Sequence, residues 1–380
     1  MNSSPPRTPS PPVRITSLDG LRGIAVLFVL VHHFGLHLPN WLDCGPVAPN
    51  IFFLLSGYLI TRSLMKMQRR PESGQIFSFH VRRLVRLLPA LYAMLAVGWL
   101  TGLSEFREGW TWHVAFLTNI QMTIQDDWSG IASHLWSLST QEQFYILWPL
   151  ILLLPARWLL PSLLMAFVGA TLFRITCLQA GSTDFFRWFL LPGSLDAFAA
   201  GGIVAWIALT RKDGLIIPPR WRWPFLSIVL GCWSLARTLR TDYGSNSHYI
   251  ACIDTLETLV FAGLLIELLQ YKGSLLSRAF SNRPLCFLGR ISYGLYLWHM
   301  LILFSVDPLL DTFGWNAQAH PFLRCGALIS CSIVVAWISW ILLEKPFIIW
   351  GQKLTAAQTH IAQKFAQTLK SLSGLIRISS

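Results

Sequence analysis

Residues 20–38 read GLRGIAVLFVLVHHFGLHL, an almost unbroken apolar stretch. A helix needs about 20 predominantly apolar residues to cross the hydrocarbon core of a bilayer. The segment 110–124 is too short and too polar to do so. Nine further apolar runs have suitable length, at residues 47–65, 84–103, 140–156, 158–178, 189–209, 224–240, 250–270, 285–306 and 322–343. The sequence therefore predicts an all-α integral membrane protein, a bundle of about ten transmembrane helices.

The composition agrees with this fold class. Of the 380 residues, 53% are hydrophobic and 13% are charged, whereas a soluble globular domain carries about 25% charged residues. These values exclude a soluble enzyme and a disordered chain. The basic residues that give the net charge of +12 lie between apolar runs. A nucleic-acid-binding protein would instead gather Lys and Arg on one solvated face, so this class of protein is disfavoured. Seven cysteines show no metal-binding or redox spacing, and we interpret them as small core residues.

The distribution of basic residues predicts the orientation in the membrane. Cytoplasmic loops of membrane proteins are enriched in Lys and Arg. The two terminal segments and the even-numbered loops, counting Arg22 and Arg62 at span ends, hold 24 of the 30 basic residues. The odd-numbered loops and their span ends hold six, namely Arg107, Arg174, Arg187, Arg237, Arg240 and Arg324. Both termini are therefore predicted to be cytoplasmic, in agreement with an even number of spans.

Two terminal segments are predicted to flank the transmembrane domain, which we assign to residues 15–347. Residues 1–14 contain five prolines and are expected to form a disordered cytoplasmic tail. Residues 348–380 are expected to form a basic amphipathic helix on an anionic membrane surface. The alternative is a helix packed against the protein itself.

The first span carries two ionisable residues, Arg22 and His33. A charge within hydrocarbon is costly and usually marks a site or a pathway. The two residues are 11 positions apart, so they share one helix face and lie about 16 Å apart along the axis. That face presents a cation near the cytoplasmic end and an imidazole toward the outer half, while His32 points about 100° away. The alternative is a snorkelling arginine and a histidine bonded in the core.

Two further groups of polar residues are candidates for the site. Arg82, Arg83 and Arg86 lie where the loop enters the third span, and their guanidinium forks can grip phosphates. Ordinary loop charge or lipid headgroup binding is the alternative. Glu142 is expected at the outer mouth of the fourth span, where it could orient an imidazole or simply cap the helix. Ser137, Tyr145 and His299 are further polar candidates for the site.

Metal and cofactor fingerprints are missing from the sequence. It contains no HExxH motif, no phosphate-binding loop and no dinucleotide fingerprint. The histidines are scattered and give no convincing set of metal ligands. We therefore expect no metal and no permanently bound cofactor.

Six ordered stretches resemble the signatures of the acyltransferase-3 family of membrane acyltransferases. They are LDGLRGIA (18–25) with His33, FFLLSGYLIT (52–61), RRLVRLLP (82–89), LWSLSTQEQFYILWP (135–149), ISYGLYLWH (291–299) and LEKPF (343–347). The resemblance covers about residues 15–347. It implies a ten-span bundle that moves an acyl group, commonly acetyl from acyl-CoA, onto a sugar or another acceptor. That acceptor is often a glycan on the outer side of a bacterial cytoplasmic membrane.

The resemblance also implies roles for individual residues. Arg22 and His33 match the family's arginine–histidine pair, Arg82, Arg83 and Arg86 match its arginine-rich patch, and Glu142 matches the glutamate of its fourth-span signature. His33 is then the expected base, the arginines receive the CoA phosphates, and Glu142 holds the histidine tautomer or assists proton transfer.

The sequence departs from the family pattern at several points. Gln141 stands where a second glutamate is usual, and Ser194 stands where an arginine often precedes the aspartate at 196. No SGNH-type hydrolase domain follows, so no second transfer step is expected from this sequence.

Two other classes of function are weighed against an O-acetyltransferase. A transporter or flippase of a polar substrate also needs intramembrane Arg, His and Glu, but the chain shows no inverted repeat of five-span halves. A structural or sensing protein is disfavoured by the polar groups gathered on the first four spans. The expected partners are acyl-CoA as donor, a carbohydrate or lipid-linked glycan acceptor and membrane lipids, with no nucleic acid.

Overall fold

A computed structural model describes residues 15–36, 38–39, 45, 47–69, 75–151, 154–211, 216–243 and 250–354. The predicted tail at 1–14 and most of the predicted amphipathic helix at 348–380 lie outside these residues. Within them, residues 348–354 continue the preceding helix without a break.

The described part of the chain is helical and contains no strand. The long helices are α1 (Thr16–His33), α2 (Ala48–Arg69), α3 (Gln75–Leu100), α7 (Leu135–Ile151), α8 (Ala156–Gln179), α10 (Leu191–Thr210), α11 (Arg222–Tyr243), α12 (Ile250–Gln270), α15 (Ser292–Thr312) and α16 (Pro321–Ser339). Short helices connect them, namely α4 (Ser104–Glu108), α5 (Trp110–Val114), α6 (Thr118–Gln125), α9 (Asp184–Phe189), α13 (Leu275–Phe280) and α14 (Arg283–Arg290). Two 3₁₀ turns and one π-helical turn complete the described elements, namely η1 (Gly130–Ala132), η2 (Pro219–Trp221) and η3 (Trp340–Glu344).

Each of the ten predicted apolar runs coincides with helix, which confirms the all-α class. One boundary was wrong: the run 285–306 is divided, because α14 ends at Arg290 and α15 begins at Ser292. Five described helical segments are long and apolar enough to cross a membrane, namely Ile76–Leu100, Ala156–Gln179, Asp184–Thr210, Ser292–Thr312 and Pro321–Leu354. The full number of spans and the orientation of the termini stay predictions.

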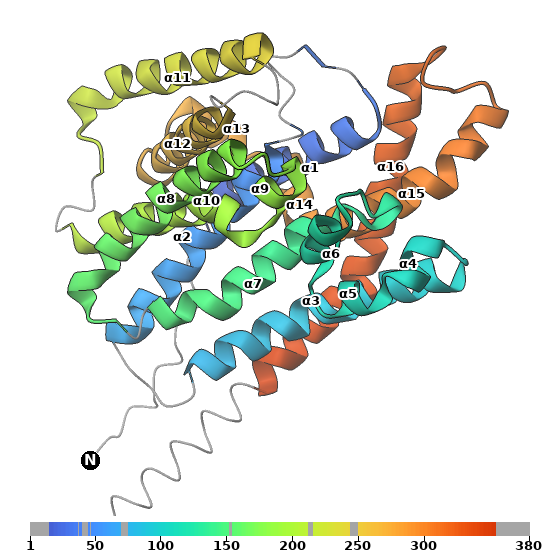
Figure 1. The fold of residues 1–380 in the computed structure, drawn as a ribbon, viewed down its shortest axis with the longest axis horizontal. Coiled ribbons are helices and arrows are strands. Elements are labelled where there is room, and N and C mark those ends of the chain that lie inside the picture. The colour runs from blue at the N-terminus through green and yellow to red at the C-terminus, as the bar shows by residue number, and fades with distance from the viewer. Residues whose placement is uncertain are drawn as a thin grey trace, which may run out of the picture.

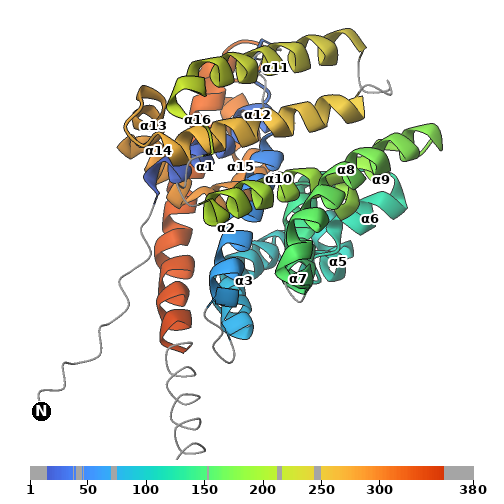
Figure 2. The same ribbon diagram turned by 90° about the vertical axis from the view of Figure 1, so that its left-hand side faces the viewer.

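The helix α1 lies near the centre of the bundle and contacts α2, α12, α13, α14, α15 and α16 (Figure 1). At one edge α11 lies beside α12, as Figures 1 and 2 both show. On another side α3 packs against α15 and η3. Residues of α1 therefore face several helices at once, which makes this helix a suitable carrier of site residues.

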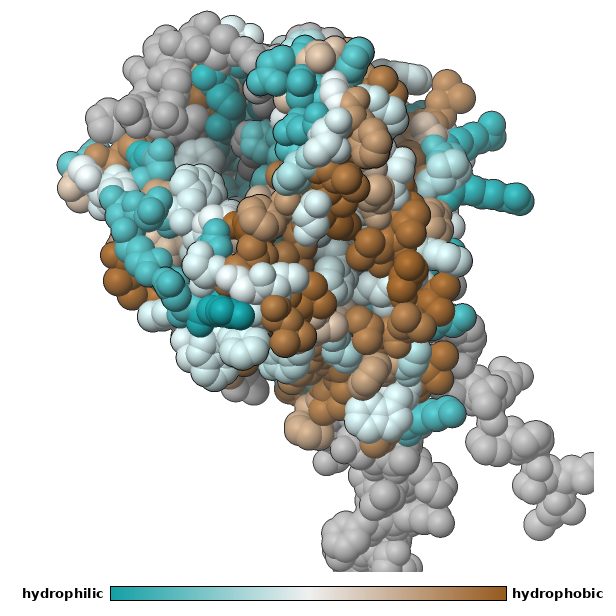
Figure 3. Space-filling model, turned by 90° about the vertical axis from the view of Figure 1, so that its right-hand side faces the viewer, coloured by the Kyte–Doolittle hydropathy of each residue, from teal (hydrophilic) through white to brown (hydrophobic). Residues whose placement is uncertain are grey.

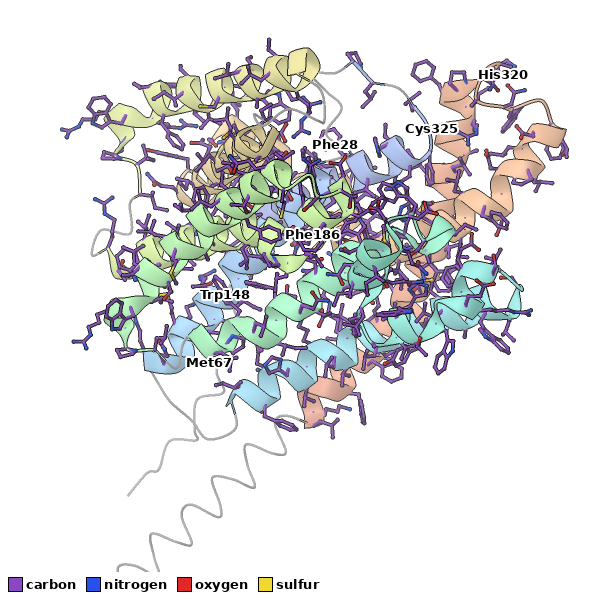
Figure 4. The ribbon with its side chains drawn as sticks, viewed as in Figure 1. Phe28, Met67, Trp148, Phe186, His320 and Cys325 are labelled. Carbon is purple, nitrogen blue, oxygen red and sulfur yellow. The ribbon has the colours of Figure 1, made fainter. Side chains whose placement is uncertain are left out.

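Aromatic rings fill the core between α2, α7 and α10. The rings of Phe53 and Phe144 both stack on the ring of Phe198. The indole Nε1 of Trp148, a residue labelled in Figure 4, donates a hydrogen bond of 2.8 Å to Oγ1 of Thr61. A buried indole N–H usually requires such a partner, and this bond fixes α7 against α2.

Glycines bring the backbones of α2 and α10 into direct contact. A Cβ atom at Gly57 would overlap the carbonyl oxygen of Phe198, and one at Gly201 would overlap the carbonyl oxygen of Leu54. Small residues permit such close approach between membrane helices. Gly57 and Gly201 are therefore packing residues of the α2–α10 contact.

Replacement of Gly201 by Ala should destabilise the bundle, because its methyl group has no space beside the Leu54 carbonyl. Overpacking of this kind typically costs about 1–3 kcal/mol. Thermal unfolding in detergent should show a lower Tm for this variant. The matched control is Gly169→Ala on α8, where a Cβ atom meets nothing within 4 Å. Equal Tm values for the two variants would contradict the close contact.

Large hydrophobic side chains are exposed on the outside of the bundle. On α16 and its continuation, Phe322, Val334, Trp337 and Leu342 are exposed. Figure 3 shows hydrophobic residues over much of the face that it presents. Soluble monomers rarely expose contiguous apolar surface of this extent. Together with the five apolar helices, this surface is that of a multi-pass membrane protein.

Candidate active site

A cavity of about 110 Å³ is lined by residues of α1, α2, α3, α7 and α15, and we call it the arginine pocket. Three guanidinium groups reach it, those of Arg22, Arg83 and Arg86. The rest of its lining combines polar side chains with an apolar wall, namely Ser56, Ser137, Gln141, Tyr145, Ser292, Tyr293 and Tyr296 with Pro49, Phe52, Phe53, Leu87 and Leu138. Five of the six stretches singled out in the sequence thus meet in one cavity.

The helix α3 presents two of its three arginines to the pocket. Arg83 and Arg86 are three residues apart and share one helix face, whereas Arg82 is exposed and does not line the cavity. The Nε atom of Arg86 is buried and has no hydrogen-bond partner among the described residues. A buried polar group without a partner is costly, so an anionic ligand in the pocket would satisfy it.

Glu142 holds Arg83. The Nη2 and Nε atoms of Arg83 donate to Oε1 of Glu142 at 2.8 and 3.1 Å, and the guanidinium lies over the ring of Tyr145. The hydrogen bonds of Glu142 therefore go to an arginine and not to His33, the imidazole that it was expected to orient. In this structure Glu142 positions a wall of the pocket.

The contact brings together two residues that the sequence placed toward opposite sides of the membrane. The helix α3 begins at Gln75 and not at 84, and α7 begins at Leu135 and not at 140. Arg83 and Glu142 consequently each lie about two turns inside their helices, where the ends of apolar runs had been taken as helix ends.

A short chain of hydrogen bonds crosses the wall of the pocket. Oγ of Ser137 lies 2.5 Å from Oη of Tyr296, which lies 2.6 Å from the carbonyl oxygen of His134. Because a carbonyl oxygen only accepts, the Tyr296 hydroxyl donates to it and accepts from Ser137. Gln141 occupies the position of the usual second glutamate, and its Nε2 donates to the hydroxyls of Ser56 and Tyr145.

Three imidazoles lie behind Tyr296, and we call them the histidine cluster: His33 on α1, His134 just before α7 and His299 on α15. The ring centroids of His33 and His134 lie 4.9 and 5.0 Å from that of His299. The ring of Tyr296 lies 5.6 Å from His299 and 5.7 Å from His134. Tyr296 therefore lines the arginine pocket and also contacts two rings of the histidine cluster.

Hydrogen bonds to backbone carbonyl groups fix the tautomer of two of these rings, those of His33 and His299. Nδ1 of His33 lies 2.9 Å from the Val29 carbonyl oxygen, and Nδ1 of His299 lies 2.6 Å from the Tyr296 carbonyl oxygen. Each Nδ1 must donate its proton, which leaves a lone pair on Nε2. The Nε2 atom of His299 is buried without a partner among the described residues. A neutral imidazole with a free Nε2 lone pair can serve as a general base.

The third ring, that of His134, lies between two backbone carbonyl groups. Burial, and then the proximity of His33, lowers the pKa of His134 to about 3. Both of its ring nitrogens face carbonyl oxygens, those of Ile131 and Leu297, at 3.1 and 3.2 Å.

Within the described residues, no group of three or more His, Cys, Asp and Glu side chains is placed to hold a metal ion.

Sequence reasoning missed three residues of the site, namely Tyr296, His134 and Glu344. Glu344 lies in η3 with both carboxylate oxygens buried and without a hydrogen-bond partner in the described chain, and Arg86 is the opposite charge that acts on it. A signal was present, because Glu344 is the last acidic residue of the sequence and ends a long apolar run. His134 directly precedes a quoted stretch, and Tyr296 lies within another.

A second group of buried charges involves α8, α10, α11 and α12 and does not line the arginine pocket. Nη2 of Arg174 lies 2.7 Å from Oδ2 of Asp196, and Nη2 of Arg240 lies 2.7 Å from Oε2 of Glu257. The arginine missing at position 194 is therefore replaced by Arg174, which reaches Asp196 from the preceding long helix.

Known proteins resemble the chain over most of its length. The family described as an acyltransferase domain, acyltransferase-3, matches residues 15–343. The chain is 28% identical over 353 residues to the peptidoglycan O-acetyltransferase OatA of Listeria monocytogenes, covering 87% of this chain and 55% of that protein. It is 26% identical over 370 residues to the "Putative peptidoglycan O-acetyltransferase YrhL" of Bacillus subtilis, covering 87% and 54%.

The chain thus spans about half the length of these curated relatives. No solved structure matches it significantly. The family match contains the arginine pocket and the histidine cluster in full. The chain therefore belongs to the acyltransferase-3 family.

Proposed function

We propose that the protein is a membrane O-acetyltransferase that moves an acetyl group from acyl-CoA to a hydroxyl of a carbohydrate-type acceptor, such as a cell-surface glycan. Its location would be the inner membrane of a bacterium, with the donor arriving from the cytoplasm. The observation that carries the proposal is that three arginines line a pocket whose Tyr296 also contacts His134 and His299, and that His299 in turn contacts His33. Membership of the acyltransferase-3 family and the similarity to peptidoglycan O-acetyltransferases support the same reaction.

The arginine pocket is the proposed site of the donor. Arg22, Arg83 and Arg86 supply guanidinium N–H groups, which form strong, charge-assisted hydrogen bonds to phosphate. The buried Nε atom of Arg86 has no hydrogen-bond partner among the described residues, so it is free to donate such a bond. Glu142 acts indirectly, because its two hydrogen bonds fix the guanidinium of Arg83.

The histidine cluster is the proposed site of the chemistry. As the acceptor oxygen attacks the thioester carbonyl carbon, its proton passes to Nε2 of His33. The C–S bond then breaks, and the CoA thiolate takes up the proton from the imidazolium. The products are an acetyl ester and free CoA. Ser137 and Tyr145 in the pocket and His299 in the cluster are the proposed contacts of the acceptor.

Transfer of labelled acetyl in proteoliposomes tests this function. The purified protein should convert acetyl-CoA labelled in the acetyl group, together with a glycan extract, into an alkali-labile labelled ester and free CoA. The controls are liposomes without the protein and proteoliposomes given labelled acetyl-CoA without the glycan extract. Mass spectrometry of cell-surface glycans with and without the protein identifies the acceptor. Movement of an unmodified polar substrate across the bilayer without acyl-CoA would replace the proposal by the transporter hypothesis.

A further inference from the structure

The helix α1 ends immediately beside the proposed base. His33 is its last residue, and the chain then turns through Phe34 and Gly35, which has a left-handed φ of 71°. The Leu36 N–H donates to the Val31 carbonyl and the Gly35 N–H donates to the His32 carbonyl. This is the Schellman pattern, which closes a helix and satisfies its last carbonyl groups. It leaves the Phe34 carbonyl to be satisfied by another partner.

That partner is Arg324 of α16. Its Nη1 donates to the Phe34 carbonyl oxygen, while its Nε and Nη2 donate to the two carboxylate oxygens of Asp307 on α15 at 2.5 and 2.6 Å. His320 and Cys325, which Figure 4 labels, flank this arginine near the start of α16. The Arg324 residue is only 8% exposed, and such bidentate, charge-assisted bonds fix direction as well as distance. One side chain thus joins the end of α1 to both α15 and α16.

The hydrogen bonds of Arg324 link α1 and α15, the helices that carry His33 and His299. Phe34 directly follows His33, and Asp307 lies eight residues after His299 on α15, about 12 Å along the helix. The apolar core already holds these helices together, since Phe34 packs with Leu295 and Leu328. Apolar packing is not directional, whereas the guanidinium bonds determine where the last turn of α1 sits.

We propose that Arg324 and Asp307 are positioning residues that set His33 against His299. The pair touches neither donor nor acceptor in the proposed mechanism and acts through the backbone of Phe34. The proposal rests on the proposed function, because positioning of His33 matters for rate only if His33 is the base. Displacement of a reacting group by about 1 Å can cost roughly 100-fold in rate.

The test uses Arg324→Lys and Asp307→Asn in the full chain. Lysine keeps the charge but cannot make the forked contact, so kcat should fall by about 10- to 100-fold while the KM for acetyl-CoA stays within twofold. Arg324→Ala should be no better than Arg324→Lys. The matched control is Arg222→Lys, because Arg222 makes a similar forked pair with Glu267 between α11 and α12. That variant should keep kcat within twofold per folded molecule.

A second readout does not depend on activity. Nitrogen-15 spectra of labelled histidine should show the His33 resonances shifted in Arg324→Lys and unchanged in Arg222→Lys. An unchanged kcat with unshifted His33 resonances in Arg324→Lys would overturn the positioning role. If the wild-type protein transfers no acetyl group, the proposed function fails, and the spectra alone then decide whether Arg324 positions His33.

Discussion

Replacement of His33 by Gln should lower acetyl transfer by at least ~100-fold, because general base catalysis contributes about 10²–10⁴-fold. Glutamine keeps hydrogen-bonding capacity but takes up no proton at neutral pH. In the structure Nδ1 of His33 is used by the Val29 carbonyl, so Nε2 is the nitrogen that can act as base. The measurement is the initial rate of labelled acetyl transfer at saturating acetyl-CoA. Donor binding should stay near the wild-type value.

His32→Gln is the matched control, because it removes an imidazole one residue away that is exposed to the surroundings. Its rate should stay within about threefold of the wild type, since His32 points about 100° from His33 around the helix. Should His33→Gln also transfer acetyl within threefold of the wild type, His33 is a packing residue and the assignment of the base fails.

Replacement of Arg86 by Ala should raise the KM for acetyl-CoA by about 10- to 100-fold, because a hydrogen bond to a charged group contributes about 1.5–3 kcal/mol. The Nε atom of Arg86 is buried and unpaired within the described chain, so the ligand bond has no internal competitor there. Arg86→Lys should restore affinity only in part, since lysine is a point charge without the planar fork. Steady-state kinetics with varied acetyl-CoA measure this effect.

Two further variants make the result specific. Arg82→Ala should leave the donor KM within about twofold, because Arg82 is exposed and does not line the pocket. Arg86→Ala also leaves the buried Glu344 carboxylate without its opposite charge, which threatens folding. The double variant Arg86→Ala/Glu344→Gln removes that charge and should fold while keeping the high donor KM. A normal donor KM in the folded double variant would contradict phosphate binding at Arg86.

The sequence predicts the helices and the arginines of the site well, for a local reason. Apolar runs of about 20 residues mark helices directly, and the polar residues that interrupt them stand out. Arg22, Arg83 and Arg86 were singled out in this way, and the structure brings them to one cavity. The position of helix ends was less certain, because polar residues such as Glu142 lie inside a helix that the apolar pattern had already ended.

The histidine cluster could not be predicted from local pattern. His33, His134 and His299 are separated by more than 100 residues from one another, and only the packing of α15 beside α1 and η1 brings them together. The partner of Asp196 was hidden in the same way, because Arg174 comes from another helix. One sequence shows which side chains are unusual in hydrocarbon, but it does not show which of them meet.

The buried ion pairs of α8, α10, α11 and α12 have a consequence for biogenesis. A single arginine or aspartate costs about 2.5–3.5 kcal/mol at the centre of an inserting helix and less near a helix end, where long side chains can reach the interface. In the predicted ten-span arrangement, α11 brings Arg240 and α12 brings Asp254 and Glu257, and these groups pair at 2.6 and 2.7 Å. Released singly, each helix would carry uncompensated charge into lipid.

The two helices should therefore leave the translocon together as a hairpin whose charges already neutralise each other. The helix α8, with Arg174, should likewise remain near the translocon until α10 delivers Asp196. Loss of one of these charges would then first reduce the amount of protein inserted in the membrane, before any step of acetyl transfer is affected. The order of synthesis is thus part of what allows this sequence to keep so many charges inside a bilayer.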